Sequence, residues 1–201
     1  LALSYRYGDF SLVYPLARGG GALLAALGGA LLLSDHLPPL AWVAVVVVAV
    51  GLASLAAPAA RGPAVTAALA LAAVIGLYTL VDARGARVSE AASYGLATFT
   101  ADAVASALVL TATQRWRTGI RIARSSPAVC LGAGLAALAA YAMVLAAVRH
   151  APVGYVAALR ESSVVIAAFA GWRLLREPPG AARVISAIVV LFGLVLLVVA
   201  G

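Results

Sequence analysis

Long apolar runs alternate with short polar segments along the whole chain. Seven such runs can be counted, and each is close to the length of about 20 residues that a helix needs to cross the hydrocarbon core of a bilayer. They cover residues 9–34, 40–57, 64–81, 91–111, 128–148, 153–175 and 183–201. The pattern predicts an all-α fold, a polytopic bundle of transmembrane helices.

The composition supports this fold class and removes one class of function. Hydrophobic residues make up 65% of the 201 residues and charged residues 10%, whereas a soluble domain has roughly half apolar and about a quarter charged residues. The formal net charge of +7 comes from 14 basic residues, which are all arginine. Most of them lie in the short segments between the runs, as is usual in membrane proteins. The positive charge therefore does not indicate nucleic-acid binding.

Residues that carry catalysis or bind cofactors are scarce. Cys130 is the only cysteine, and His36 and His150, the only histidines, both lie beside polar segments. The sequence contains no HExxH, no GxSxG and no phosphate-binding glycine loop. We therefore expect no metal site, no nucleotide or redox cofactor and no enzyme activity.

Two of the runs resemble each other at a fixed offset of 142 residues. The matched residues are Arg18 and Arg160, Gly29 and Gly171, Asp35 and Glu177, and the dipeptides Gly51-Leu52 and Gly193-Leu194. Each arginine begins a stripe of small residues along one helix face, a pattern that lets membrane helices pack closely. The matching runs lie five spans apart, and successive spans alternate in direction, so the two copies run oppositely through the membrane. Inverted repeats of this kind are typical of transporters, whose substrate sites lie near the midplane.

Three stretches carry a family resemblance: "SLVYPLARG…LLLSDHLPPLAW", "GLYTLVDARGARVS", and the final segment that begins "APVGYVAALRESSVV" and includes "LLREPP". Over essentially the whole chain, the sequence resembles an EamA-type member of the drug/metabolite transporter (DMT) superfamily. The resemblance implies ten helices in two inverted five-helix repeats, of which this chain carries about seven, with three further helices expected upstream. Residues 1–57 would be the C-terminal part of the first repeat, 58–63 a linker and 64–201 the second repeat. Asp35 departs from the family pattern, in which glutamate is usual.

Two arginines inside the apolar runs are the first candidates for substrate binding. Intramembrane ionisable side chains usually face a cavity or the bundle interior and pair with one another. We expect Arg18 and Arg160 to line a central cavity and to bind the anionic part of a substrate, because the guanidinium fork matches two carboxylate oxygens. The alternative is an interhelical ion pair with a purely structural role.

Three further residues complete the predicted site. Glu161 and Asp102 are expected to hold the arginines when no substrate is bound, and either is a candidate carrier of a coupling proton. Neighbouring residues on a helix do not face each other, so we expect Arg160 and Glu161 to have different partners. Tyr78, at the end of the run 64–81, is a candidate wall residue of the cavity.

Two functions stay open on the sequence alone. The first is a secondary transporter that moves small metabolites, anionic or amino-acid-like, across the plasma membrane, with substrate, membrane lipid and a coupling proton as partners. The second is a non-transporting membrane scaffold or partner subunit.

The orientation of the chain in the membrane is predicted differently by two arguments. The arginine count places the segment 112–127 in the cytoplasm, whereas the resemblance places both termini there. We follow the resemblance.

Overall fold

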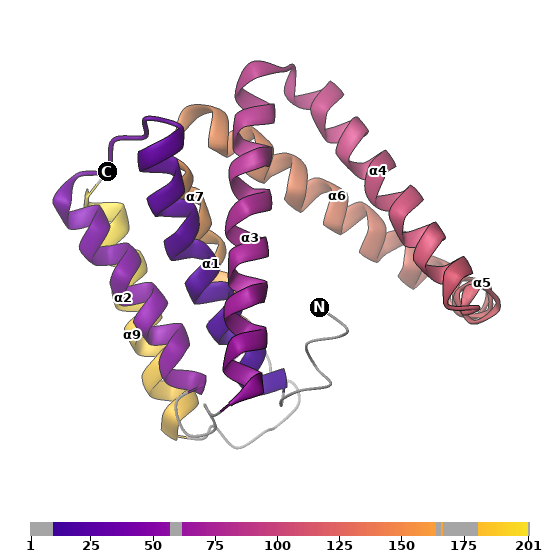
Figure 1. Cartoon of the computed structure of the whole chain (residues 1–201), viewed down its shortest axis with the longest axis horizontal. Coiled ribbons are helices and arrows are strands. Elements are labelled where there is room, and N and C mark those ends of the chain that lie inside the picture. The colour runs from indigo at the N-terminus through magenta and orange to yellow at the C-terminus, as the bar shows by residue number, and fades with distance from the viewer. Residues whose placement is uncertain (1–9, 57–61, 164–165, 167–180, 201) are drawn as a thin grey trace. The chain divides into compact units, whose positions relative to one another are not determined.

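The computed structural model describes residues 10–56, 62–163, 166 and 181–200, and these form helices joined by short connections (Figure 1). The helices are α1 (Phe10–Leu32), α2 (Pro39–Ala56), α3 (Pro63–Val88), α4 (Ala91–Ala112), α5 (Trp116–Ser125), α6 (Pro127–His150), α7 (Val153–Arg160) and α9 (Ala181–Ala200). They confirm the predicted all-α class. Three helical segments are long and apolar enough to cross a membrane: Val65–Val88, Ala92–Ala112 and Pro127–His150. Shorter apolar helices cover Leu16–Leu32, Pro39–Ser54 and Val184–Ala200.

Two features depart from the predicted runs. Helix α7 ends at Arg160, and Glu161 lies in a turn, so the predicted span 153–175 is interrupted where its charges lie. A separate helix, α5, occupies most of the segment between α4 and α6 that the sequence analysis treated as a loop. Gly171, Glu177 and the "REPP" segment, which contributed to the repeat and the resemblance, lie outside the described residues.

By its internal contacts the chain divides into two units. The first comprises residues 1–82 and 151–201, and so holds α1, α2, most of α3, α7 and α9. The second comprises residues 83–150, with the end of α3 and the helices α4, α5 and α6. The charged residues of α1 and α7 therefore lie within a single unit.

Helices α2 and α9 pack against each other in antiparallel fashion. Val45 belongs to one buried cluster with Leu197, and Leu52 belongs to the next with Val190, so residue numbers rise along α2 as they fall along α9. The hydroxyl groups of Ser54 and Ser186 continue this register at a distance of 2.6 Å. Lipid tails are as apolar as these side chains, so close packing rather than exclusion of water holds such helices together in a bilayer.

Two glycines set the close approach of α2 and α9. A methyl group at Gly51 would lie 2.9 Å from Cγ2 and 3.1 Å from the backbone nitrogen of Val190. A methyl group at Gly193 would lie 2.7 Å from Cγ2 and 3.0 Å from the backbone nitrogen of Val48. At the offset of 142 residues, Gly51 corresponds to Gly193 and Val48 to Val190. The contact of Gly51 with Val190 is therefore equivalent to the contact of Gly193 with Val48.

Alanine at either of these glycines should destabilise the protein. The added methyl group meets backbone as well as side-chain atoms, and overpacking of this kind costs about 1–3 kcal/mol. Gly132 and Gly134 of α6 are matched controls, because a methyl group there meets no atom within 4 Å. Thermal melting in detergent should show a loss for G51A and G193A and no loss for G132A and G134A. Equal melting of all four variants would contradict this packing.

In the second unit, two arginines donate hydrogen bonds to carbonyl oxygens at the ends of helices. Arg87 Nε donates a hydrogen bond to the carbonyl oxygen of Val148 at 2.8 Å, in the last turn of α6. Arg149 Nη1 donates to the carbonyl oxygen of Ser89 at 2.9 Å, just beyond the end of α3. Basic side chains commonly satisfy the last carbonyl groups of helices in this way. These two arginines therefore have a sufficient structural explanation.

Candidate functional site

The register between α1 and α7 is fixed by a glycine and a carboxylate. A methyl group at Gly154 would lie 2.7 Å from Cβ of Ala26, so the two helices are in near contact at that point. Asp35, just beyond α1, accepts a hydrogen bond from the backbone N–H of Val153 at 2.7 Å. This carboxylate satisfies a donor at the N-terminus of α7 and complements the positive end of the helix dipole. With the start of α7 held beside the C-terminal part of α1, its end comes to lie beside Arg18.

Helix α7 ends at Arg160, directly before Glu161, and both residues belong to the predicted site. The N–H of Glu161 donates to the carbonyl oxygen of Ala158 at 3.0 Å, which is a tight turn rather than a further helical hydrogen bond. The hydroxyl group of Ser163 donates to the carbonyl oxygen of Arg160 at 2.9 Å. Interrupted helices in transporters expose backbone and polar side chains beside their binding sites. The end of α7 is therefore a candidate binding region.

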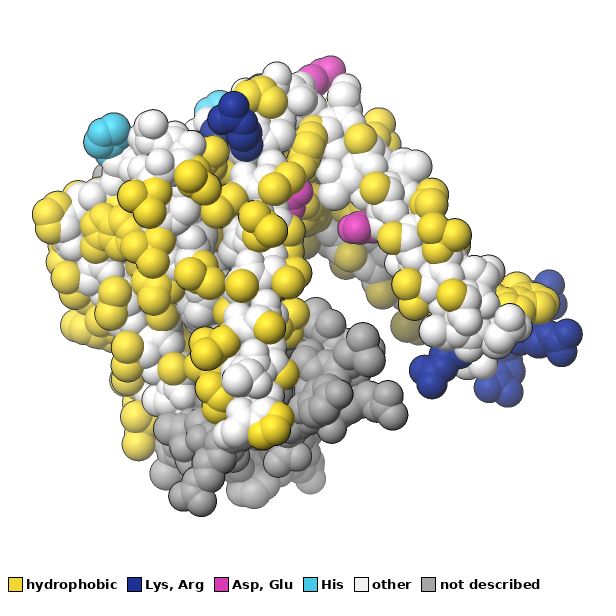
Figure 2. Space-filling model, in the orientation of Figure 1, with side chains coloured by type: hydrophobic (Ala, Val, Ile, Leu, Met, Phe, Trp, Pro, Cys, Tyr) yellow, Lys and Arg dark blue, Asp and Glu magenta, His cyan; other side chains and the backbone are white. Residues whose placement is uncertain are grey.

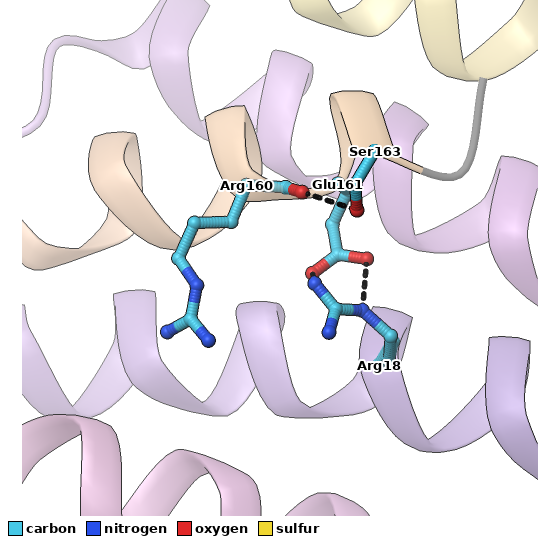
Figure 3. A network of polar contacts seen from close by, with 4 residues as sticks. All are labelled: Arg18, Arg160, Glu161 and Ser163. Atoms are coloured by element: carbon cyan, nitrogen blue, oxygen red, sulfur yellow. Dashed lines mark hydrogen bonds and ion pairs between the residues drawn. The ribbon is translucent and has the colours of Figure 1, made fainter. Parts of the chain in front are cut away.

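Arg18 and Glu161 form a bidentate ion pair between α1 and the end of α7 (Figure 3). Arg18 Nε donates to Glu161 Oε2 at 2.8 Å, and Arg18 Nη2 donates to Oε1 at 2.9 Å. The side chain of Glu161 is 5% exposed and that of Arg18 is 20% exposed. Parallel N–H···O bonds of this kind are among the strongest polar contacts in proteins. The pair explains how a charge in the first apolar run is compensated.

Arg160 lies beside this pair but does not join it. Figure 3 shows its side chain extending separately from the contact between Glu161 and Arg18. The half-buried guanidinium of Arg160 has no hydrogen-bond acceptor or carboxylate partner among the residues that the structure describes. Glu161 thus has a partner on α1, whereas the partner predicted for Arg160 stays a prediction.

The repeat offset accounts for the difference between the two arginines. Glu161, the partner of Arg18, corresponds to Gly19 in the other copy. In the mirrored arrangement Arg160 would contact position 19. This position is glycine, which has no side chain to pair with the arginine. Gly19 also packs closely, because a methyl group there would lie 3.0 Å from the carbonyl oxygen of Ala49. The sequence thus places two arginines at equivalent positions, with a carboxylate at the mirrored position for Arg18 and none at that position for Arg160.

A small pocket in the first unit brings these charges together. Its lining comes from α1, α3 and the end of α7, and consists of Arg18, Gly21, Ala22, Ile75, Tyr78, Thr79, Ala157, Arg160 and Glu161. The enclosed space is about 10 Å³, roughly what one water molecule needs. In this conformation the pocket therefore has room only for the end of a small polar group, such as one carboxylate oxygen.

Four of the five predicted site residues line this pocket: Arg18, Arg160, Glu161 and Tyr78. Asp102, the fifth, lies on α4 in the second unit with an exposed side chain. Its role beside the arginines stays a prediction.

Thr79 is a pocket residue that the sequence analysis missed. It is 5% exposed, and its hydroxyl group donates to the carbonyl oxygen of Ile75 at 2.7 Å. The hydroxyl oxygen remains able to accept a hydrogen bond from a ligand. A polar residue directly after Tyr78, in a run that has only one other threonine, Thr66, was the available signal.

The fold and the pocket define a class of protein, an all-helical membrane protein with charged residues gathered inside a helical unit. The family then follows from sequence, because the model of the EamA-like transporter family matches residues 62–199. This chain belongs to that family, whose members are membrane transporters of the DMT type, and the resemblance drawn from the sequence is confirmed. No curated protein and no solved structure matches the chain.

Proposed function

We propose that this chain belongs to a secondary transporter that moves small anionic or amino-acid-like metabolites across the plasma membrane, and that Arg160 binds the anionic group. The observation that carries the proposal is a guanidinium without a carboxylate partner among the described residues, in a pocket beside one that has such a partner. A charge at the centre of a transmembrane helix costs about 2.5–3.5 kcal/mol on insertion scales. A structural arginine would be expected to have its charge compensated, as Arg18 has.

The charges of the pocket favour an anion. Arg18 and Arg160 contribute two positive charges and Glu161 one negative charge, so the described lining has a net charge of +1. A carboxylate fits the donor fork of Arg160, and guanidinium stays protonated at all relevant pH. Tyr78 and Thr79 add hydroxyl groups that can bind the polar remainder of a small metabolite.

The inverted repeat supplies the transport mechanism. We assign residues 1–57 to the first repeat, 58–63 to a linker and 64–201 to the second. The reciprocal contacts of Gly51 with Val190 and of Gly193 with Val48 support this assignment, as does the antiparallel packing of α2 and α9. In transporters built this way, one repeat rocks against the other around a fixed site.

Glu161 is the first candidate for proton coupling. Its carboxylate faces Arg18 within the same pocket. Uptake of a proton by Glu161 would break the bidentate pair, so that the Nε and Nη2 donors of Arg18 could turn to the substrate. Asp102 is the alternative proton carrier.

A structural role for the charges is the second candidate function. The bidentate Arg18–Glu161 pair favours it, because an interhelical ion pair needs no substrate to explain it. A scaffold or partner subunit would contain such a pair equally well. Arg160 decides between the two functions, since the ion pair does not involve it.

Transport by the purified complete protein in proteoliposomes tests the proposal. Pairs of labelled compounds that differ only in a carboxylate and its amide are the sharpest probes, because they match in size. We expect saturable uptake of at least one carboxylate and at least tenfold slower uptake of its amide, since charge-assisted hydrogen bonds contribute about 1.5–3 kcal/mol. Uptake no faster than in protein-free liposomes for the whole set, or equal uptake of acid and amide, would contradict it.

A further inference from the structure

The connection between α4 and α6 carries a concentration of charge that the pocket does not use. Helix α5 has the sequence WRTGIRIARS. Its arginines, Arg117, Arg121 and Arg124, recur at the spacing that places residues on one face of a helix. Trp116 and Ile120 follow the same spacing on the adjacent face and are 41% and 44% exposed. No residue of α5 is buried, so both faces are available to a partner.

The position of α5 in the chain confines it to a membrane surface. It joins two candidate spans, Ala92–Ala112 and Pro127–His150, with only short connections on either side. Helix α4 ends sharply before it, because Gln114 takes a left-handed conformation with φ 56°. Figure 1 shows α5 end-on where α4 and α6 run across the view, so α5 lies crosswise to both of its neighbours. When α4 and α6 span the bilayer, α5 lies along its surface.

The charge of α5 is not neutralised within the chain. The sequence contains no acidic residue between Asp102 and Glu161. No carboxylate of the described residues forms an ion pair with the arginines of this helix. The guanidinium of Arg117 lies 5.3 Å from the ring centre of Trp116, so one cation rests against an apolar ring. Figure 2 shows arginine and hydrophobic side chains gathered together at this end of the second unit.

From this arrangement we infer that α5 is an interfacial anchor that binds the headgroups of anionic phospholipids. Trp116 and Ile120 enter the boundary of the acyl chains, and the three arginines bind headgroup phosphates. Helices with basic residues on one face and tryptophan on another lie in the interface in this manner. Guanidinium binds phosphate oxygens in bidentate fashion. The exposed apolar side chains favour a lipid surface over a dissolved anion, which would use only the arginines.

Lipid-dependent thermal melting of the complete protein in detergent tests this anchor. The probes are phosphatidylglycerol, phosphatidylcholine and inorganic phosphate, each added at the same phosphate concentration. The variants are R117Q/R121Q/R124Q, the charge-preserving R117K/R121K/R124K, and R84Q as a control at an exposed arginine of α3. The second readout is the ratio of phosphatidylglycerol to phosphatidylcholine retained after purification from mixed vesicles.

We expect phosphatidylglycerol, and neither of the other probes, to raise the melting temperature of the wild type and of R84Q. The triple glutamine variant should melt like the wild type without lipid, lose this gain and retain on the order of tenfold less phosphatidylglycerol, while the lysine variant keeps most of both effects. An unchanged gain in the glutamine variant, or an equal gain with inorganic phosphate, would overturn the proposal. So would a glutamine variant that fails to fold in phosphatidylcholine, because the arginines would then have a structural role.

Discussion

Replacing Glu161 with glutamine is expected to destabilise the protein by about 3–5 kcal/mol, the usual cost of removing one partner from a buried ion pair. The side chain of Glu161 is 5% exposed and holds Arg18 through two hydrogen bonds. The variant removes the negative charge that Glu161 places beside a guanidinium inside an apolar helix. Arginine cannot relieve this by losing its proton, because the guanidinium group stays protonated in proteins.

The reverse substitution should cost less. In Arg18→Met the carboxyl group of Glu161 can take up a proton and become neutral, which arginine cannot do. The double variant R18M/E161L removes both charges and should recover much of the lost stability, since apolar replacement of a buried pair is often neutral. Thermal melting of the wild type, R18M, E161L and R18M/E161L forms a double-mutant cycle. Glu90→Gln, at an exposed glutamate, is the matched control and should stay within about 0.5 kcal/mol of the wild type. A melting temperature of E161Q equal to that of E90Q would contradict the role of the pair.

The sequence was informative where the pattern is long and repeated. Seven apolar runs predicted helices that the structure confirms in the described residues, apart from the interruption at Glu161. The charges inside these runs indicated the site, because a charge among apolar residues needs a specific reason. The prediction that Arg160 and Glu161 have different partners followed from helix geometry alone. Glu161 was expected to hold the arginines, but its contact with Arg18 depends on the register of α1 against α7 that Gly154 and Asp35 fix.

The interruption of α7 could not be read from local sequence. Neither proline nor glycine stands at Glu161, and the flanking residues are compatible with a continuous helix. The hydroxyl group of Ser163 binds the carbonyl oxygen of Arg160 next to the turn. The turn also coincides with the ion pair to α1, a contact distant in the sequence. Tertiary contacts of this kind decide the end of a helix without leaving a sequence signature.

Helix α5 was missed for a different reason. Its arginines were counted as loop charges in the argument on orientation, and their helical spacing was not considered. The periodicity of Arg117, Arg121 and Arg124 was present in the sequence. A segment of ten residues is marginal as an isolated helix, so the pattern alone would not have established it.

Replacing Arg160 with glutamine is expected to reduce transport of an anionic substrate by roughly 10–100-fold, which corresponds to the loss of about 1.5–3 kcal/mol of charge-assisted hydrogen bonding. Arg160→Lys keeps the charge but loses the planar fork of donors, so its rate should fall between those of the wild type and Arg160→Gln. Neither variant should lose folded protein, because no carboxylate of the described residues pairs with Arg160. A loss of folded protein in both variants would favour the structural role instead.

The most direct measurement is the initial rate of uptake of one carboxylate by wild type, Arg160→Lys and Arg160→Gln, at matched levels of protein in the membrane. The amide of the same compound serves as the uncharged control in each case. If Arg160 is the anion-binding group, uptake of the carboxylate falls in the order wild type, lysine, glutamine, and the slow uptake of the amide changes little. Undiminished uptake of the carboxylate by Arg160→Gln would contradict the assignment.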